Sequence, residues 1–204
     1  MSIPVVADAD TLFAATTRAL LIYLDYEGLI KLHWSPLILD EVSWALTETG
    51  RKRTLEEARA SVTRMSDALP NAMVSKKDVH AQFHSVVGAV RSAKDTHVAA
   101  CAHCLVAAEA YPGSPVVALV SRNTKDFKKA ALAQLGIALH SPDNFLDELT
   151  AARPNGVAAA FRRFRLDLAS SPTPKVLLER LDRDGLAMAA ARLLQLHQAK
   201  SATL

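Results

Sequence analysis

The fold is decided by Val5-Val6-Ala7-Asp8-Ala9-Asp10-Thr11-Leu12-Phe13, in which a short apolar run meets two carboxylates and then a helical pattern. The apolar run, residues 3–7, is typical of a buried parallel strand, and the helical pattern continues to about Tyr26. In open α/β sheets, ligands bind beyond the carboxyl ends of the strands, often at helix N-termini. Asp8 and Asp10 are therefore placed either for chemistry or, as the simpler alternative, for capping the helix.

The composition is that of a globular protein. Of the 204 residues, 50% are hydrophobic and 22% are charged, which suits one domain of ordinary size and an extension. No apolar run approaches the roughly 18 residues of a membrane span, and no export leader is visible. Cys101 and Cys104 lie three apart in an apolar helical pattern, as expected in a reducing compartment. We therefore expect a cytoplasmic protein that does not associate with membranes.

Strand and helix patterns alternate over residues 1–150, which predicts an α/β fold with a parallel sheet covered by helices on both faces. The strands are expected at 3–7, 116–120 and 137–140, with a further short one possible at 72–75. The helices are expected at about 10–26, 36–50, 54–69, 79–90, 94–111, 127–134 and 142–150. We therefore expect residues 1–150 to form one α/β domain.

Residues 151–204 show only helical patterns, at about 157–169, 174–183 and 185–199, and are expected to form a helical extension. This extension carries a net charge of +5, whereas residues 1–150 carry −2. Its clustered arginines are candidates for contacts with RNA phosphates; they are Arg162, Arg163 and Arg165. The alternatives are a solvated helix face, or helices that pack on the domain or across a dimer.

Acidic residues from four separate segments are expected at one edge of the sheet. Asp8 and the loop 121–126 both follow buried strands, whose carboxyl ends share an edge in a parallel sheet. Asp95 begins a helix, and Glu41 lies near the start of another. Clustered carboxylates repel one another and persist where they hold a hard cation, so Mg²⁺ or Mn²⁺ is the expected cofactor. Such an ion activates water and stabilises charge on a phosphodiester.

Residues 4–148 resemble the PIN-domain ribonucleases, particularly the VapC-type toxins of bacterial toxin–antitoxin pairs. Four segments carry the resemblance, in order and at plausible separations. They are the strand ending in Asp8, Ser35-Pro36-Leu37-Ile38-Leu39-Asp40-Glu41-Val42, Lys94-Asp95-Thr96-His97-Val98-Ala99-Ala100, and Ser121-Arg122-Asn123-Thr124-Lys125-Asp126-Phe127 with the later Ser141-Pro142-Asp143-Asn144-Phe145-Leu146.

The resemblance implies a metal-dependent endoribonuclease whose catalytic and metal-binding acids are Asp8, Glu41, Asp95 and Asp126. It also implies an RNA substrate, an antitoxin that fills the groove, and a homodimer. Two positions depart from the family pattern. Asn123 stands where many members have an acid, which leaves Asp126 as the candidate fourth carboxylate, and Asp10 stands where many members have a neutral residue. Ser121 is a candidate for hydrogen bonding within the site.

Several alternatives remain open at this point. Asp8 and Asp10 also resemble the start of haloacid-dehalogenase-type phosphatases, but Thr11 follows Asp10 without the usual spacer. A PIN fold with a weakened metal site could serve as an RNA- or protein-binding module, which Asn123 favours. Cys101-Ala102-His103-Cys104 lacks a second ligand pair for zinc and is expected in the core. His97 follows Asp95 by two positions, faces away from it on a helix, and is expected to be structural.

Overall fold

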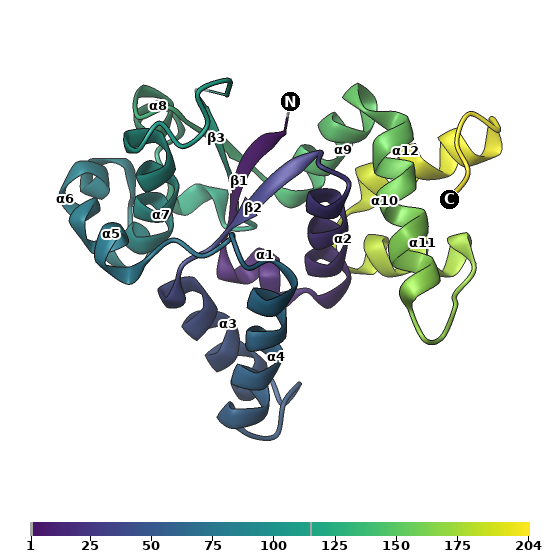
Figure 1. Cartoon of the computed structure of the whole chain (residues 1–204), viewed down its shortest axis with the longest axis horizontal. Coiled ribbons are helices and arrows are strands. Elements are labelled where there is room, and N and C mark those ends of the chain that lie inside the picture. Colours follow the sequence, from purple (N-terminus) through teal and green to yellow (C-terminus); the bar gives the residue numbers. More distant parts are fainter. Residues whose placement is uncertain (1, 115) are drawn as a thin grey trace. The chain divides into compact units, whose positions relative to one another are not determined.

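The computed structural model describes residues 2–114 and 116–204 and confirms the α/β class (Figure 1). Four strands form one sheet in the order β2-β1-β3-β4. Their bounds are β1 Ile3–Ala7, β2 Ile30–His33, β3 Val117–Val120 and β4 Ile137–His140. β1 pairs in parallel with β3, and β3 pairs in parallel with β4. The two central strands, β1 and β3, are the most buried, as expected for apolar strands in a parallel sheet that helices cover.

The register of these strands aligns their carboxyl ends. Ala7 lies opposite Val120, and Val120 lies opposite His140. The backbone pairing continues one residue further, because the Asp8 N–H donates to the carbonyl oxygen of Val120 at 2.9 Å. The Ser121 N–H likewise donates to the carbonyl oxygen of His140 at 3.1 Å. Asp8 and Ser121 therefore leave the sheet at the same edge, as the sequence predicts.

Short helices surround this sheet within the same compact unit. Their bounds are α1 Ala9–Phe13, α3 Pro36–Glu48, α4 Leu55–Ala68, α5 Lys76–Ala81, α6 Phe83–Val86, α7 Thr96–Ala107 and α8 Lys129–Gln134, with 3₁₀ turns η1 Val87–Ala89, η2 Ala93–Asp95 and η3 Thr124–Asp126. α7 packs against β1, β3 and β4. Ser35 caps α3, because its hydroxyl accepts a hydrogen bond from the Ile38 N–H and Pro36 occupies the first turn.

The remaining helices form a second compact unit. Their bounds are α2 Ala15–Tyr26, α9 Pro142–Ala152, α10 Pro154–Asp167, α11 Pro174–Arg183 and α12 Ala187–Gln198. Within this unit, α2 packs against α10, and α12 packs against α9 and α11. The Tyr23 ring of α2 lies 5.4 Å from the Phe164 ring of α10. Aromatic contact of this kind, with the buried leucines of α2, gives the unit its own core.

The chain therefore divides differently from the expected boundary at residue 150. One unit, here called the α/β unit, comprises the chain up to Phe13 together with Lys31–His140. The other, here called the helical unit, comprises Ala14–Ile30 and Ser141–Leu204. The difference arises because α2 and α9 pack with the C-terminal helices, a choice that local patterns do not encode.

Three elements also differ locally from expectation. The helix expected at 10–26 is divided at Ala14, whose extended backbone separates α1 from α2. The helix expected at 79–90 is broken into α5, α6 and η1. The sequence did not indicate β2, and the possible strand at 72–75 is a single bridge between Met73 and Trp34. Across the described residues, every helix is too short or too polar to cross a membrane.

Candidate active site

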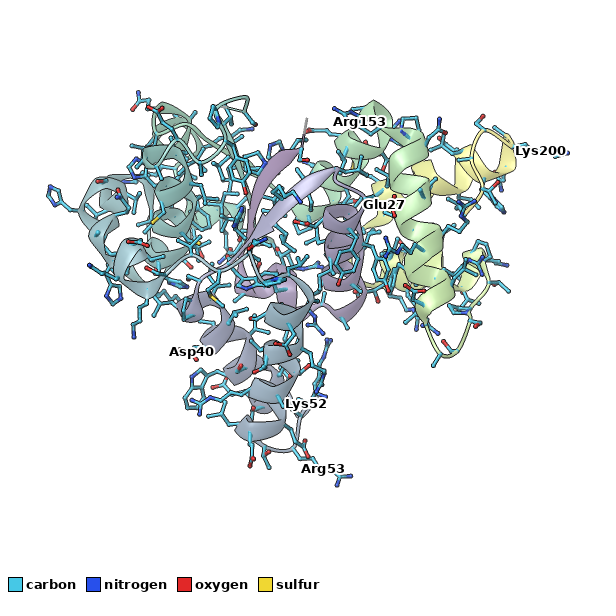
Figure 2. All side chains as sticks on the ribbon, in the orientation of Figure 1. Glu27, Asp40, Lys52, Arg53, Arg153 and Lys200 are labelled. Atoms are coloured by element: carbon cyan, nitrogen blue, oxygen red, sulfur yellow. The ribbon has the colours of Figure 1, made fainter. Side chains whose placement is uncertain are left out.

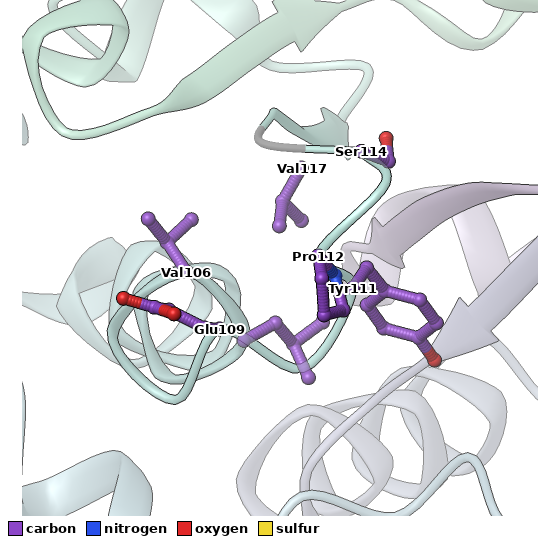
Figure 3. A pocket seen from close by; sticks show the side chains of 7 residues that line it. Val106, Glu109, Tyr111, Pro112, Ser114 and Val117 are labelled. Atoms are coloured by element: carbon purple, nitrogen blue, oxygen red, sulfur yellow. The ribbon is translucent and has the colours of Figure 1, made fainter.

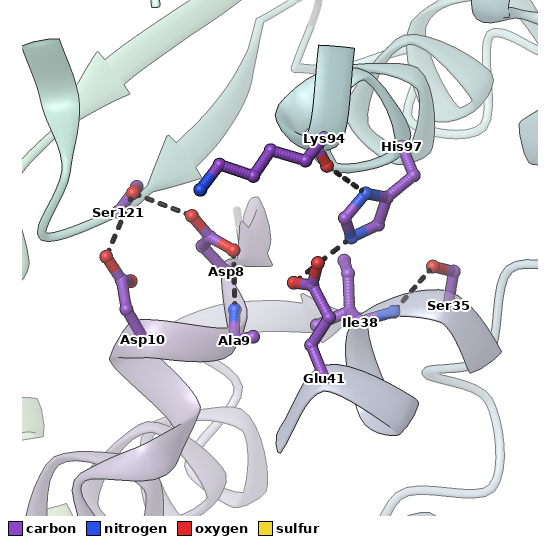
Figure 4. A network of polar contacts seen from close by, with 9 residues as sticks. All are labelled: Asp8, Ala9, Asp10, Ser35, Ile38, Glu41, Lys94, His97 and Ser121. Carbon is purple, nitrogen blue, oxygen red and sulfur yellow. Dashed lines mark hydrogen bonds and ion pairs between the residues drawn. The ribbon is translucent and has the colours of Figure 1, made fainter. Parts of the chain in front are cut away.

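Asp8 is the most enclosed of the expected acids. It directly follows β1 and is 6% exposed, although most buried carboxylates in proteins have a cationic partner. One carboxylate oxygen, Oδ1, accepts a hydrogen bond from the Ala9 N–H at 2.6 Å. The other, Oδ2, accepts one from the Ser121 hydroxyl at 2.8 Å (Figure 4). Both donors are neutral, so the negative charge of Asp8 is oriented by them but is not neutralised.

The pKa of Asp8 is raised from 3.8 to about 7, and burial is the largest cause. The nearby charge of Asp10 contributes to this rise, and that of Glu41 adds a smaller effect in the same direction. The hydrogen bonds from Ser121 and Ala9 oppose the shift because they favour the ionised form. The fold thus holds at this position a carboxylate that binds a proton near neutral pH and would gain from a cation.

Asp10 fixes the loop that follows β3. Its carboxylate accepts hydrogen bonds from the N–H groups of Arg122, at 3.2 Å, and Asn123, at 3.0 Å. The Ser121 hydroxyl also lies 3.4 Å from Asp10 Oδ2. Neither Asp8 nor Asp10 is therefore only a helix cap. Asp10, the residue that departs from the family pattern, connects β1 to the loop that carries the other polar candidates.

Glu41 is presented by α3 and is held by His97 of α7. His97 Nε2 lies 3.4 Å from Glu41 Oε2, and His97 Nδ1 lies 2.7 Å from the carbonyl oxygen of Lys94 (Figure 4). Burial lowers the pKa of His97, but the hydrogen bond and charge of Glu41 outweigh burial, and the net shift is upward. The sequence-based expectation considered His97 only in relation to Asp95 on its own helix. It therefore missed the contact with Glu41, which belongs to α3.

Asp95 is the N-cap residue of α7, and one of its carboxylate oxygens, Oδ2, is buried without a hydrogen bond in the described part of the chain. Burial raises the pKa of Asp95, and the charges of Asp126 and Glu41 add to that effect, while Lys94 and His97 oppose it. A buried acceptor without a donor is costly, and in a native site it calls for an explanation such as an absent ion or water.

Asn123 and Asp126 act together rather than as alternatives. The Asn123 side-chain amide donates a hydrogen bond to Asp126 Oδ2, so the neutral residue orients the charged one. The backbone around Asp126 is held by the segment before Asp95, because the Arg91 N–H donates to the Asp126 carbonyl oxygen at 2.7 Å. A bridge between Val90 and Phe127 continues this pairing. This pairing brings Asp126 close enough to Asp95 to shift its pKa.

The acids thus form two pairs, Asp8 with Asp10 and Asp95 with Asp126, and the charge of Glu41 acts on both. The four expected acids all belong to the α/β unit. Their oxygens do not close around one point, since no group of three or more His, Cys, Asp or Glu side chains in the described part of the chain is arranged to hold a metal ion.

The three arginines that are candidates for contacts with RNA belong to the helical unit, and two of them make contacts within it. Arg163 contacts Glu27, which is labelled in Figure 2, at 3.4 Å and lies over the Tyr26 ring. Arg165 donates to the Pro172 carbonyl oxygen at 3.1 Å. Arg162 is exposed. Arg163 and Arg165 therefore each make a contact that stabilises the helical unit itself.

The cysteines and a cavity beside the start of β3 do not add to the site. Cys101 and Cys104 are reduced and buried, and burial raises the pKa of Cys104 to about 11 and that of Cys101 still further. A cavity of about 380 Å³ lies between the end of α7 and the start of β3, lined partly by Glu109 and Tyr111 (Figure 3). It lies at the amino ends of the strands, away from the acids.

Comparison with protein-family models, with curated proteins and with solved structures finds no match to this chain.

Proposed function

We propose that this chain is a metal-dependent endoribonuclease of the PIN type. The observation that supports the proposal most strongly is Asp8, a buried carboxylate at the carboxyl end of a parallel strand with a pKa of about 7 and neutral hydrogen-bond donors. Strongly perturbed carboxylates beside further acids are typical of functional sites, because the fold alone gains nothing from them. The four motif segments that resemble the PIN ribonucleases supply the reaction class.

The donor groups fit a hard divalent cation. The buried, unpartnered Oδ2 of Asp95 and the elevated pKa of Asp8 are both relieved by positive charge. Carboxylate oxygens are the ligands that Mg²⁺ and Mn²⁺ prefer, and the residues that would hold such an ion are Asp8, Glu41, Asp95 and Asp126. When bound, the ion supplies a more acidic water and stabilises charge on the phosphodiester. Glu41, whose charge acts on both acid pairs, would complete the ligand set between them.

The neighbouring side chains would position these acids. Ser121 and the Ala9 N–H fix the two oxygens of Asp8, and His97 restrains Glu41. Asn123 orients Asp126. The Lys94 side chain extends from η2 toward Asp8 (Figure 4), where an ammonium group could contact a phosphate oxygen of a bound RNA.

The biological setting proposed here follows the family resemblance. The chain would be the toxin of a toxin–antitoxin pair in the cytoplasm, inhibited by a cognate antitoxin protein and assembled as a homodimer. The most direct check is the neighbouring reading frame, where a small DNA-binding protein would support this setting.

The enzymatic proposal is tested by RNA cleavage with Mg²⁺ or Mn²⁺ present. Asp8→Asn should lower the rate by at least about 100-fold, as expected when a group acting in the transition state is lost. Asp67→Asn, at an exposed position on α4, is the control and should cleave at the wild-type rate. Asp126→Ala should reduce the rate more than Asn123→Ala, because Asn123 acts through Asp126. Cleavage by Asp8→Asn at the wild-type rate would refute the assignment.

A binding module without catalysis is the second candidate, and one observation favours it. The acids as they stand do not form a set of three around a single point in the described residues. Calorimetric titration with Mn²⁺ separates the two candidates. Saturable Mn²⁺ binding that Glu41→Gln weakens would support the nuclease, and binding of RNA without any Mn²⁺ binding would support the module.

A further inference from the structure

A second cavity of about 380 Å³ opens beside the acids, on the side of Glu41. Its walls come from α3, from α5 and α6, from η2 and from the start of α7, all within the α/β unit. The residues that matter here are Leu37, Glu41, Trp44, His80, Phe83 and Lys94. Glu41 and Lys94 thus belong both to this cavity and to the acid site, so a ligand bound at the acids can reach the cavity without leaving the surface.

One face of α3 forms the first wall. Leu37, Glu41 and Trp44 are spaced by four and three residues, so they lie in line on the helix. Trp44 is 54% exposed, whereas Trp34, the only other tryptophan, is completely buried. The core therefore does not explain Trp44, which presents a large aromatic face to solvent next to Glu41.

Another part of the lining is aromatic. The His80 and Phe83 rings are in edge-to-face contact, with centroids 5.0 Å apart and planes at 70°. Lys76 and Lys77 precede them on α5 and are exposed. A flat aromatic surface with ammonium groups beside it is suited to a nucleotide, because the base stacks and the phosphates meet the positive charges.

We propose that this cavity is a nucleobase subsite, in which the base of the nucleotide next to the cleaved bond stacks on Trp44 against the Phe83 wall. The proposal rests on the proposed function for the location of the phosphate, and it adds which part of the RNA the chain recognises. RNA is favoured over a protein segment because the cavity is continuous with the acids through Glu41, and because Lys94 in its lining can meet a phosphate while Trp44 and Phe83 offer faces for a base. The carboxylate of Asp40 also lines the cavity, so the positive charge is local to Lys94 and to the exposed Lys76 and Lys77 outside it.

Trp44 provides a direct measurement. Since Trp34 is buried, a ligand that stacks in the cavity should quench the fluorescence of Trp44 alone. The probes are single-stranded RNA octamers, titrated into the full chain with EDTA so that nothing is cleaved. We expect saturable quenching in the wild type and none in Trp44→Phe. Affinity should fall about 10-fold in Trp44→Ala and about 3-fold or less in Trp44→Phe, since a phenyl ring still stacks.

Val87→Ala is the matched control, because Val87 is an exposed apolar residue of the same unit that does not line the cavity. Its RNA affinity should equal that of the wild type. An octamer series with one abasic position moved along the chain provides the second arm. At one position, loss of the base should cost the wild type about 10-fold in affinity and cost Trp44→Ala almost nothing, because both changes remove the same contact.

The outcomes separate this proposal from the proposed function. If RNA is cleaved but Trp44→Ala binds and cleaves it like the wild type, the subsite is refuted and the nuclease stands. If RNA quenches Trp44 and abasic substitution is coupled to Trp44→Ala, but no divalent ion supports cleavage, the subsite stands and the nuclease is refuted. If RNA does not quench the fluorescence of Trp44, the subsite is refuted. The same holds if a purified protein partner quenches Trp44 and RNA does not.

Discussion

The helical unit and the sheet edge both contain partly or fully buried aspartates, but these aspartates have opposite kinds of neighbours. In the helical unit, Asp184 accepts hydrogen bonds from the first-turn N–H groups of α2, donated by Thr16 at 3.1 Å and Thr17 at 3.2 Å. Asp143 does the same for α12, at Met188 and Ala189. Each carboxylate therefore satisfies backbone donors that a helix terminus would otherwise leave without partners.

Asp147 of the helical unit has a cationic partner. It accepts two hydrogen bonds from Arg192, at 2.5 and 2.8 Å, and this guanidinium lowers the pKa of Asp147. At the sheet edge, by contrast, Asp8 faces Asp10, Asp95 faces Asp126, and the pKa values of Asp8 and Asp95 are raised. The acids of the helical unit thus have donors or a cation as partners, whereas those at the sheet edge face other acids, as the proposed metal site would require.

The largest effect is expected from removing residues 153–204, which takes away Asp184 and the partner helices of α2. The buried leucines of α2 and its first-turn N–H groups would then be exposed to water. We expect an aggregated product or one without a cooperative thermal transition, measured by gel filtration and circular dichroism. A fragment ending at Ala152 that melts like the full chain would show that the helical unit is dispensable for α2.

The next largest effect is a gain of stability in Asp8→Asn. The folded pKa of about 7 exceeds the ordinary 3.8, so the unfolded chain releases this proton more readily. The wild type therefore loses stability as the pH rises from about 4 to about 7, and the loss is complete above that range. At pH 8 the variant should be more stable by about 1–4 kcal/mol.

Urea unfolding at pH 4 and pH 8 measures this difference, which should be small at pH 4. Added Mg²⁺ should stabilise the wild type and not the variant, since only the wild type retains the charge. A variant less stable than the wild type at pH 8 would contradict the view that Asp8 opposes folding.

Asp184→Ala tests the other side of the comparison and should be destabilising. Loss of a capping carboxylate typically costs about 1–2 kcal/mol, and here α2 has no capping side chain of its own because its N-cap is Ala14. Asp182→Ala is the control, at an exposed position in the last turn of α11, two residues before Asp184. RNA cleavage by both variants should match the wild type. Equal stability of the two variants would mean that the contact with Thr16 and Thr17 contributes nothing.

The smallest effect is expected from Asp147→Asn, because the substituted amide oxygen still accepts a hydrogen bond from Arg192 and the Arg192 side chain is 40% exposed. The sign of its pH dependence is opposite to that of Asp8. The folded pKa is lowered, so the contribution is present above the ordinary pKa near 4 and is lost as the pH falls through the folded value. The thermal midpoint of the variant should therefore lie slightly below that of the wild type at pH 7 and approach it at pH 2–3.

Local signals predicted the elements that have clear ends. The strand at 137–140 follows Gly136, the helix at 174–183 begins with proline, and both were predicted at their observed bounds. β2 was missed, because four residues with Lys31 among them carry too little periodicity. The division into units was also missed, since the cap of α2 comes from Asp184, far along the chain. Local sequence patterns do not predict a hydrogen bond between residues that are far apart in sequence and meet only through tertiary packing.

The same distinction holds for the candidate site. The motifs predicted that Asp8, Glu41 and Asp95 would lie at strand ends or helix starts, and the structure places them there. The contact of His97 with Glu41 and the bonds from Asp10 to the loop after β3 join separate segments. They depend on the register of β1 and β3 and on how α3 meets α7, so sequence spacing gave no signal for either.

The position of α2 has a consequence for synthesis on the ribosome. α2 is made early, but its partner α10 begins only at Pro154, more than a hundred residues after α2 ends at Tyr26. At translation speeds of about 5–20 residues per second, its apolar face waits roughly 6–25 s for α10 to emerge. A nascent chain stalled before residue 154 would therefore expose Leu20, Leu21 and Leu24 to chaperones. A chaperone bound to these leucines would delay completion of the helical unit until the last helices are synthesised.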